Sequence, residues 1–347
     1  MTWLLTSDLH LTDRPRDAYR FELFAWLAKQ QEKHSVTATF ILGDLTDKKD
    51  KHSASLVNRL VDELIGLKPP VYILRGNHDG VDPSNPYFRF LNTIDGVQFI
   101  VDPICLPEHQ VAMIPHQPDQ ESLDSACGLL IPTTPGWGPK AVFLHQCLTG
   151  AISEASGARL TGLAWPLVSQ THARLGVYAG DIHRPQRLDN GVTYVGAPYH
   201  VRFGDDYTPR VLLLRDGKEQ NLYFPAPRKW ALTVQHEDDI FNDEDLHEGD
   251  QVRLTVELGR EEAVEWSDRR KRILHVCKEA GLDVYGCELK VRSGKQERAV
   301  LKAVRSNEEV FTAFCQAEGV ANNIRKAGLS LLGGTNDNRS GTGKAGT

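Results

Sequence analysis

The sequence predicts an α/β protein with a large content of mixed β-sheet in its first 225 residues, followed by a small α+β domain. Short β-rich runs alternate with helical patterns along the first part, as βαβ units require. Between Gln235 and Asp250 the chain becomes strongly acidic, and a new β–α–β–α pattern begins after it. We therefore expect one domain over 1–230 and another over 235–320.

The strands and helices of the first domain follow from its apolar patterns. Two helices, Tyr19–Lys33 and Ser53–Leu67, are predicted between early strands, which favours parallel pairing there. Several later strands follow one another without helices, which predicts mixed or antiparallel pairing. Eight runs of mainly apolar residues predict strands: Trp3–Thr6, Thr39–Leu42, Val71–Leu74, Val111–Ile114, Ala141–Leu144, Val177–Ala179, Val192–Val195 and Val211–Leu214.

The second domain has its own elements and ends in a polar tail. The tail, 333–347, is rich in Gly, Ser, Thr and Asn, so it cannot offset the entropy of ordering and is expected to be disordered. The elements predicted before it are strand Gln251–Leu258, helix Glu261–Ala280, strand Val284–Val291 and helix Glu308–Glu318.

Composition indicates a globular protein of the cytoplasm. The chain has 347 residues, of which 40% are hydrophobic, enough for a sizeable core. No run approaches the roughly 18 apolar residues of a membrane span, and the first ten residues lack a basic region and a cleavage site. The six cysteines are scattered without metal-binding spacing, so we expect reduced thiols.

Two motifs with the same spacing follow predicted strands. Asp8 and His10 come directly after the first strand, and Asp181 and His183 follow a later one. Residues two apart in extended chain point to the same side. A carboxylate beside an imidazole suits an ion such as Mn²⁺, Fe²⁺ or Zn²⁺. Either motif alone is equally well explained by an Asp that caps a loop beside a surface His.

Three further motifs repeat this theme at other strand ends. Asp44 follows Gly43, Asn77 opens an Asn-His-Asp run with His78 and Asp79, and His145 ends the strand Ala141–Leu144. Glycine at 43 permits close approach of the backbone to an ion or phosphate. Since ligands bind at the carboxyl ends of strands in α/β sheets, all five motifs together predict one metal-binding crevice.

The order D-x-H, G-D-x-x-D, G-N-H-D, a lone His and a final D-x-H resembles the calcineurin-like metallophosphoesterase superfamily. The stretch YAGDIHRPQ, followed by TYVGAPYHVRFGDD, is similar to the SbcD-type DNA repair nucleases. The resemblance implies a four-layer αββα sandwich, with the C-terminal α+β domain as a cap that selects DNA.

The resemblance also implies two divalent cations, Mn²⁺ or alternatively Mg²⁺, with Asp44 as the bridging ligand. At position 181 the family usually has histidine, and the carboxylate here shifts the expected preference toward harder ions. The implied ligands of one ion are Asp8, His10, Asp44 and His183, and those of the other are Asp44, Asn77, His145 and Asp181.

The catalytic residues expected are His78 and Asp79. His78 has no required place among the ligands, so we expect it to stabilise charge on the phosphate or to protonate the leaving oxygen, with Asp79 orienting it. The net charge of −6 argues against binding nucleic acid by bulk charge, but a local basic face is compatible with it. Candidate substrate-binding residues beside the motifs are Arg14, Arg75 and Arg184, with Lys290, Arg292, Lys295 and Arg298 in the cap.

The leading hypothesis is a DNA nuclease, exonucleolytic or endonucleolytic, that acts in repair, recombination or end processing. Implied partners are DNA, an SbcC-type SMC-like ATPase bound through Val320–Leu332, and a second copy bound through Ser53–Leu67 or Asn85–Asn92. No membrane is expected as a partner. One alternative is a small-substrate phosphoesterase that hydrolyses cyclic nucleotides or nucleotide pyrophosphates. Another is a non-catalytic scaffold, against which the intact ligand set argues.

Overall fold

Successive residues of the first strand contribute to two different hydrophobic cores. In the computed structural model Leu4 belongs to one buried cluster and Leu5 to another, because neighbouring residues of a strand point to opposite faces. A sheet buried on both faces needs a packed layer on each side. The structure describes residues 1–82, 84–131, 138–153, 157–166, 176–242, 245–292, 311–312, 314–316 and 318–333.

The first sheet joins four parallel strands to an antiparallel pair. Strands β1 to β4 are parallel, and β11 pairs antiparallel with both β1 and β12. The carboxyl ends of β1, β2 and β3 therefore lie at one edge. The strands, in their order across the sheet, are β12 (Lys218–Leu222), β11 (Val211–Arg215), β1 (Thr2–Thr6), β2 (Ala38–Ile41), β3 (Val71–Leu74) and β4 (Val97–Ile100).

The second sheet has the same mixed character. Strands β6, β7, β8 and β10 are parallel, whereas β5 and β9 pair antiparallel at the two edges. Mixed pairing was predicted for these later strands and is confirmed. The strands, in their order across the sheet, are β5 (Ile104–Leu106), β6 (Val111–Ile114), β7 (Ala141–His145), β8 (Gly176–Gly180), β10 (Val192–Tyr194) and β9 (Gln186–Arg187).

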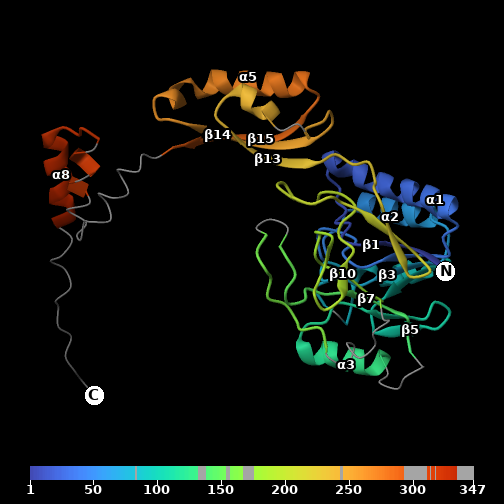
Figure 1. Cartoon of the computed structure of the whole chain (residues 1–347). Helices are drawn as coiled ribbons and strands as arrows, with labels where there is room; N and C mark the ends of the chain where they lie inside the picture. Colours follow the sequence, from blue (N-terminus) through green and yellow to red (C-terminus); the bar gives the residue numbers. More distant parts are fainter. Residues whose placement is uncertain are drawn as a thin grey trace, which may run out of the picture. The chain divides into compact units, whose positions relative to one another are not determined.

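Helices cover the outer faces of both sheets (Figure 1). Helices α1 (Glu22–His34) and α2 (Ala54–Ile65) pack on the first sheet through one cluster, and α3 (Gln120–Leu130) packs on the second through another. The third cluster fills the space between the sheets, with Phe40 and Phe143 at its centre. This arrangement confirms the predicted αββα sandwich.

The ends of the helices follow from their sequences. Ser53 begins α2, because its hydroxyl accepts the Leu56 N–H at 3.1 Å, as N-cap residues do. The helix predicted over Tyr19–Lys33 has a 3₁₀ first part, η1 (Pro15–Phe21), before α1. Helix α3 was not predicted, although Asp119 caps it by accepting the Ser122 N–H at 2.9 Å. A further 3₁₀ segment, η2 (Tyr87–Thr93), precedes β4.

A three-stranded sheet comes from the C-terminal part of the chain, with β14 in the middle. Its strands are β13 (Lys229–Val234), β14 (Gln251–Leu258) and β15 (Asp283–Val291), of which the last two were predicted. The predicted helix Glu261–Ala280 is a 3₁₀ segment, η4 (Glu262–Glu265), continued by α5 (Trp266–Glu279). The remaining elements are the 3₁₀ segment η3 (Glu237–Asn242) and helix α8 (Asn322–Gly333).

Two compact units can be distinguished along the chain. The first comprises Met1–Leu232, Ile240–Leu254 and Leu274–Cys287, and the second takes the remaining residues. The sandwich belongs entirely to the first unit. Of the predicted helix Glu308–Glu318, residues 311–312 and 314–316 are helical, whereas 308–310, 313 and 317 lie outside the described residues. Lys295, Arg298 and the tail 334–347 lie outside them too. Among the helices that the structure describes, none has the length and apolar character needed to cross a bilayer.

We expect Phe40→Ala to lower the free energy of unfolding by about 3–5 kcal/mol, the range typical of a deleted core aromatic. Phe40 is fully buried, and its ring centroid lies 4.7 Å from that of Phe143 and 5.2 Å from that of Tyr72. Urea denaturation followed by circular dichroism measures the change. Tyr223→Ala is the control, because Tyr223 is 59% exposed. Equal effects of the two substitutions would contradict the assignment of Phe40 to the inter-sheet core.

Candidate metal centre

The two sheets bring their polar strand ends to one place. Asp8 and His10 follow β1, Asp44 follows β2, His145 ends β7, and His183 follows β8. Strands β1 and β2 are parallel to each other in the first sheet, and β7 and β8 are parallel in the second, so within each sheet their carboxyl ends lie at the same edge. Asp8, His10 and His183 offer ligand atoms within 4.8 Å of one another, and so do Asp8, Asp44 and His145.

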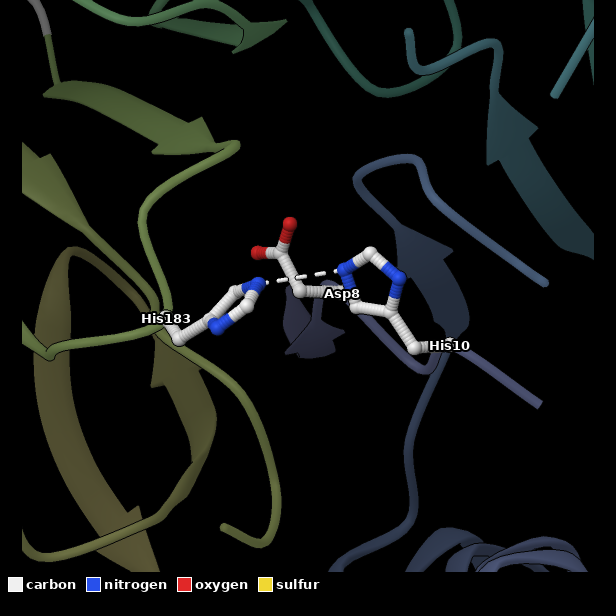
Figure 2. Close-up of side chains that lie close together, drawn as sticks. All are labelled: Asp8, His10 and His183. Atoms are coloured by element: carbon white, nitrogen blue, oxygen red, sulfur yellow. Dashed lines mark hydrogen bonds between the residues drawn. The ribbon is translucent and has the colours of Figure 1, made fainter. Parts of the chain in front are cut away.

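In the first group, Asp8, His10 and His183, the two imidazoles face each other. Their Nε2 atoms lie 3.1 Å apart, and the Asp8 carboxylate lies beside them (Figure 2). His10 Nε2 is also 3.6 Å from Asp44 Oδ2. Burial, reinforced by the neighbouring His183 and His78, lowers the pKa of His10 well below its usual value. Burial likewise lowers the pKa of His183 to about 4. Both rings are therefore neutral near pH 7 and have lone pairs for a cation.

In the second group, Asp8, Asp44 and His145, a hydrogen bond fixes the histidine ring. His145 Nδ1 lies 2.6 Å from the carbonyl oxygen of Leu42, which requires Nδ1–H as the donor. In the neutral ring Nε2 then carries the lone pair, and it faces Asp44 Oδ1 at 3.4 Å and Asp181 Oδ1 at 3.7 Å. An acceptor nitrogen directed at two carboxylate oxygens is the arrangement that a cation satisfies.

Asn77 adds a further donor atom. Its Oδ1 is shielded from solvent and accepts no hydrogen bond from any residue that the structure describes. The backbone N–H of the next residue, His78, donates to Asp44 Oδ1 at 2.9 Å, which holds this loop against the second group. Amide oxygen, carboxylates and imidazoles together form a donor set that suits Mn²⁺ or a similar ion. These residues therefore fit the expected metal.

The carboxylates are held in an environment that disfavours their charge. Burial raises the pKa of Asp8 to about 8. Burial and the neighbouring Asp79 raise the pKa of Asp44 well above its usual value. The centre thus concentrates buried acids beside the neutral rings of His10 and His183, and a divalent cation would restore the ionised form of the acids.

The backbone at the centre is unusual in the same way at four of the predicted ligands. Asp8, His10, Asp44 and Asp181 have φ values of 56°, 40°, 55° and 85°. This left-handed region is uncommon for residues other than glycine, and such conformations gather at functional sites. Asp8 is supported on both oxygens, by the Ser7 hydroxyl at 2.5 Å and by the Asp181 N–H at 3.1 Å.

Gly43 was predicted to let the backbone approach an ion or phosphate, and this stays a prediction. The structure shows a further reason for glycine at this position. With a φ of 96°, Gly43 lies directly against the imidazole of His145, where a Cβ would collide with the ring. The absence of a side chain at Gly43 lets the two sheets approach each other, and it leaves room for the ring of His145.

Asp79 has a different role from the one predicted. His78 Nδ1 lies 2.9 Å from the carbonyl oxygen of Asp47, so this carbonyl, and not Asp79, orients the His78 ring. Asp79 is fully buried and accepts the backbone N–H groups of Asp44, Leu45 and Gly76 at 2.7–2.9 Å. It therefore ties the loop after β3 to the loop after β2.

The three arginines proposed for substrate binding differ in what they contact. Arg14 is exposed and lines a cavity beside His10 and His78. Arg75 is only 7% exposed, and it donates to the carbonyl of His116 at 2.6 Å, so this contact holds the loop after β6, and its role in substrate binding stays a prediction. Arg184 donates to the carbonyl of Asp206, and it also lies 3.6 Å from the carboxylate of that residue.

The cavity beside His10 and His78, called here the basic cavity, was not predicted as a whole. All of its lining residues belong to the first unit. One carboxylate, Asp47, faces it, against five cationic side chains: Arg14, Arg20, Arg202, Lys229 and Arg253. His116, which was not among the predicted site residues, follows β6 as the predicted ligands follow their strands. Its ring centroid is 6.3 Å from that of His145.

Comparisons with known proteins agree with this geometry. Residues 1–144 match the family described as calcineurin-like phosphoesterase. That range contains the motifs from Asp8 to Asp79, whereas His145, Asp181 and His183 lie beyond it. No curated protein sequence matches the chain significantly.

Solved structures that resemble the chain include three phosphoesterases. An archaeal phosphodiesterase is 14% identical, with 65% of this chain and 100% of that chain covered and a TM-score of 0.36. A dimetal phosphatase from Danio rerio is 13% identical, with 65% and 99% covered and a TM-score of 0.37. The nuclease MPE from Pseudomonas putida is 19% identical, with 63% and 87% covered and a TM-score of 0.32.

We expect Asp181→His to shift metal preference toward Zn²⁺, because imidazole suits Zn²⁺ and carboxylate suits Mn²⁺ and Mg²⁺. The ratio of the Mn²⁺ and Zn²⁺ dissociation constants, from isothermal titration calorimetry, should change by about tenfold or more, as altered ligand support typically does. Asp62→Asn on the exposed side of α2 serves as the control. An unchanged ratio in Asp181→His would remove Asp181 from the ligand set.

Proposed function

We propose that this chain, whose N-terminal part is a metallophosphoesterase domain, is a two-metal-dependent DNA nuclease of the SbcD type. It would hydrolyse phosphodiester bonds, exonucleolytically or endonucleolytically, in repair, recombination or end processing. The family match supports phosphoester hydrolysis. The choice of DNA rests on the basic cavity.

The basic cavity supports a polyanionic substrate. Five cationic side chains and one carboxylate line it, although the whole chain carries a net charge of −6. Arg20 and Lys229 are paired with the buried Asp17 behind the wall, which leaves Arg14, Arg202 and Arg253 against Asp47. Cations gathered beside a catalytic centre in an acidic protein are expected to raise the local concentration of a polyanion. DNA presents several phosphates on either side of the bond that is cut, and phosphate contacts provide most of the affinity of non-specific DNA binding.

The metal ligands would act as the resemblance implies. Asp8, His10, Asp44 and His183 would hold one cation, and Asp44, Asn77, His145 and Asp181 the other. The two oxygens of Asp44 support its bridging role, because Oδ2 faces His10 and Oδ1 faces His145. Two divalent cations supply Lewis-acid polarisation of the phosphodiester and stabilise the attacking and leaving oxygens.

His78 would act on the leaving oxygen. Its Nδ1 is held by the Asp47 carbonyl, which leaves Nε2 as the ring nitrogen available to substrate. The ring lines the basic cavity, and its centroid lies 5.0 Å from that of His10. In its protonated form His78 would donate a proton from Nε2 to the leaving oxygen, and it would stabilise negative charge on the phosphate before that transfer.

Exposed segments of the chain are what supports the two proposed protein partners. Helix α8 occupies most of Val320–Leu332, the segment proposed for an SbcC-type ATPase. For a homodimer, Ile65 of α2 and Phe90 of η2 leave apolar side chains 62% and 38% exposed on the segments that were predicted to meet. Burial of such side chains against a second copy would be favourable.

The second candidate is a small-substrate phosphodiesterase acting on cyclic nucleotides or nucleotide pyrophosphates. The metal centre alone would serve either substrate, since both reactions cleave a phosphoester beside two cations. What separates them is the surface next to the metal ligands, where Arg14, Arg202 and Arg253 add positive charge beyond the pairs that Asp17 forms with Arg20 and Lys229. One small ester does not require so many cations.

We expect Mn²⁺-dependent hydrolysis of linear duplex or single-stranded DNA, in addition to hydrolysis of bis-p-nitrophenyl phosphate. The rate on DNA should fall steeply as salt rises, because counterion release drives phosphate binding. Gel electrophoresis of labelled DNA and absorbance of nitrophenolate measure the two activities. Activity on the small ester but on neither DNA would overturn the nuclease and favour the second candidate.

His78→Ala should keep the bound Mn²⁺ and lose turnover by about 10²- to 10⁴-fold, the usual contribution of a positioned acid or base. Elemental analysis gives the metal content, and single-turnover cleavage gives the rate. His236→Ala is the matched control, since the side chain of His236 is 53% exposed. Loss of metal in His78→Ala would contradict a role outside the ligand set.

A further inference from the structure

Two aromatic rings form part of the wall of the basic cavity. Phe203, in the loop after β10, and Tyr285, in β15, both line it together with His10 and His78. Their ring centroids lie 4.8 Å apart at an interplanar angle of 57°. Both residues are partly exposed and both belong to the first unit. An apolar surface therefore adjoins the cationic one within a single cavity.

Cations lie over both rings. The Arg253 guanidinium is 4.7 Å from the Phe203 ring centroid, and that of Arg16 is 5.0 Å from the Tyr285 centroid. Lys229 Nζ lies 5.6 Å from the first ring and 5.8 Å from the second. Such contacts draw positive charge toward aromatic faces. A ligand that lies against these rings would meet apolar surface and cations at once.

The loop that carries Phe203 is fixed by its own hydrogen bonds. Asp205 accepts the N–H groups of Val201 and Arg202 at 2.9 and 2.8 Å, and it also accepts the hydroxyl of Tyr207 at 3.1 Å. Neighbouring Tyr199 and Val201 pack into or against the hydrophobic core, whereas Phe203 is held at the cavity. A planar ligand that replaces the Arg253 guanidinium over the ring would stack on this phenyl group and leave Arg253 for a phosphate.

We propose that the basic cavity binds an unpaired nucleotide next to the scissile phosphodiester, with its base on Phe203 and its phosphate between Arg202 and Arg253. This rests on the proposed nuclease function and specifies its substrate class. A base within a duplex already has neighbours on both faces and pairs across the helix, so only an unpaired base can reach the ring. The preferred substrate is therefore single-stranded DNA or an unpaired end.

The test compares Phe203→Ala with Phe203→Trp in the full chain. Fluorescence anisotropy measures binding of a fluorescein-labelled oligothymidylate and of a duplex of equal length, both in EDTA so that no cleavage occurs. Phe203→Ala should weaken single-strand binding by roughly 5- to 100-fold, as expected for the loss of one stacked base. It should weaken duplex binding much less. Phe203→Trp should restore the preference, because tryptophan also stacks.

A second readout reports stacking directly. An oligonucleotide with 2-aminopurine should lose fluorescence on binding to the wild type and to Phe203→Trp, but not on binding to Phe203→Ala. Tyr223→Ala, which removes an exposed aromatic ring elsewhere, should behave as the wild type. Thermal unfolding of each variant confirms that the fold is kept.

Three outcomes would overturn the inference. Equal losses on single-stranded and duplex DNA would make Phe203 a general contact, and unchanged binding would remove it from the substrate site. In either case a wild type that binds and cuts DNA keeps the proposed function. A wild type that hydrolyses bis-p-nitrophenyl phosphate but neither binds nor cuts DNA would overturn both.

Discussion

The hydrogen bond between His145 Nδ1 and the carbonyl of Leu42 crosses from one sheet to the other, and the geometry of the centre depends on it. At 2.6 Å it joins the end of β7 to the end of β2. It fixes the proton on Nδ1 and so directs the Nε2 lone pair at Asp44 and Asp181. Gly43 makes the contact possible, because any Cβ there would occupy the space of the ring. The contact that packs the two sheets together is thus the same contact that orients His145 as a predicted metal ligand.

The same packing of the two sheets buries carboxylates, and their burial disfavours the ionised form. Bound cations would offset this cost, which is consistent with a centre made of metal-ligating side chains. Bringing the strand ends together removes Asp8 and Asp44 from water, and burial raises the pKa of both. Asp79 lies under them and accepts three backbone N–H groups, which offset part of its own desolvation. Asp8 accepts the Ser7 hydroxyl and the Asp181 N–H, and Asp44 accepts the His78 N–H, yet the pKa of both stays raised, so the remaining compensating charge is expected from bound cations.

What the sequence could predict was local. The carboxyl ends of parallel strands meet whatever their order, so the place of Asp8 and Asp181 directly after strands could be predicted. The extended backbone assumed for Asp8 and His10 was wrong, because β1 ends at Thr6 and both residues have left-handed φ values. Helix α3 was missed although Leu123, Ala126, Cys127 and Leu130 have helical spacing, because Gly128 interrupts the pattern. The strands β4, β5, β9, β12 and β13 were missed because most are short and several are only partly apolar.

Roles that depend on distant partners could not be predicted in this way. Asp79 stands next to His78 in sequence, which suggested that it orients the ring, but its partners are N–H groups more than thirty residues away as well as the nearby Gly76. The wall of the basic cavity is made by residues far apart in the sequence, such as Arg14, Lys229 and Tyr285. Separations of this size leave no periodic signal in a sequence.

Asp17 connects the metal centre to the cationic wall. It is fully buried and accepts Lys229 Nζ at 2.9 Å and the Thr12 hydroxyl at 3.0 Å, with Arg20 at 3.5 Å. Burial opposes its ionisation, but Arg20 and Lys229 outweigh burial and lower the pKa of Asp17. Arg20 in turn donates to the carbonyl of His10, a predicted metal ligand. Because one anion holds two buried cations, the cluster keeps positive charge beside the metals. Buried ion clusters add little stability, and under the proposed function this cluster would place positive charge where a substrate phosphate binds.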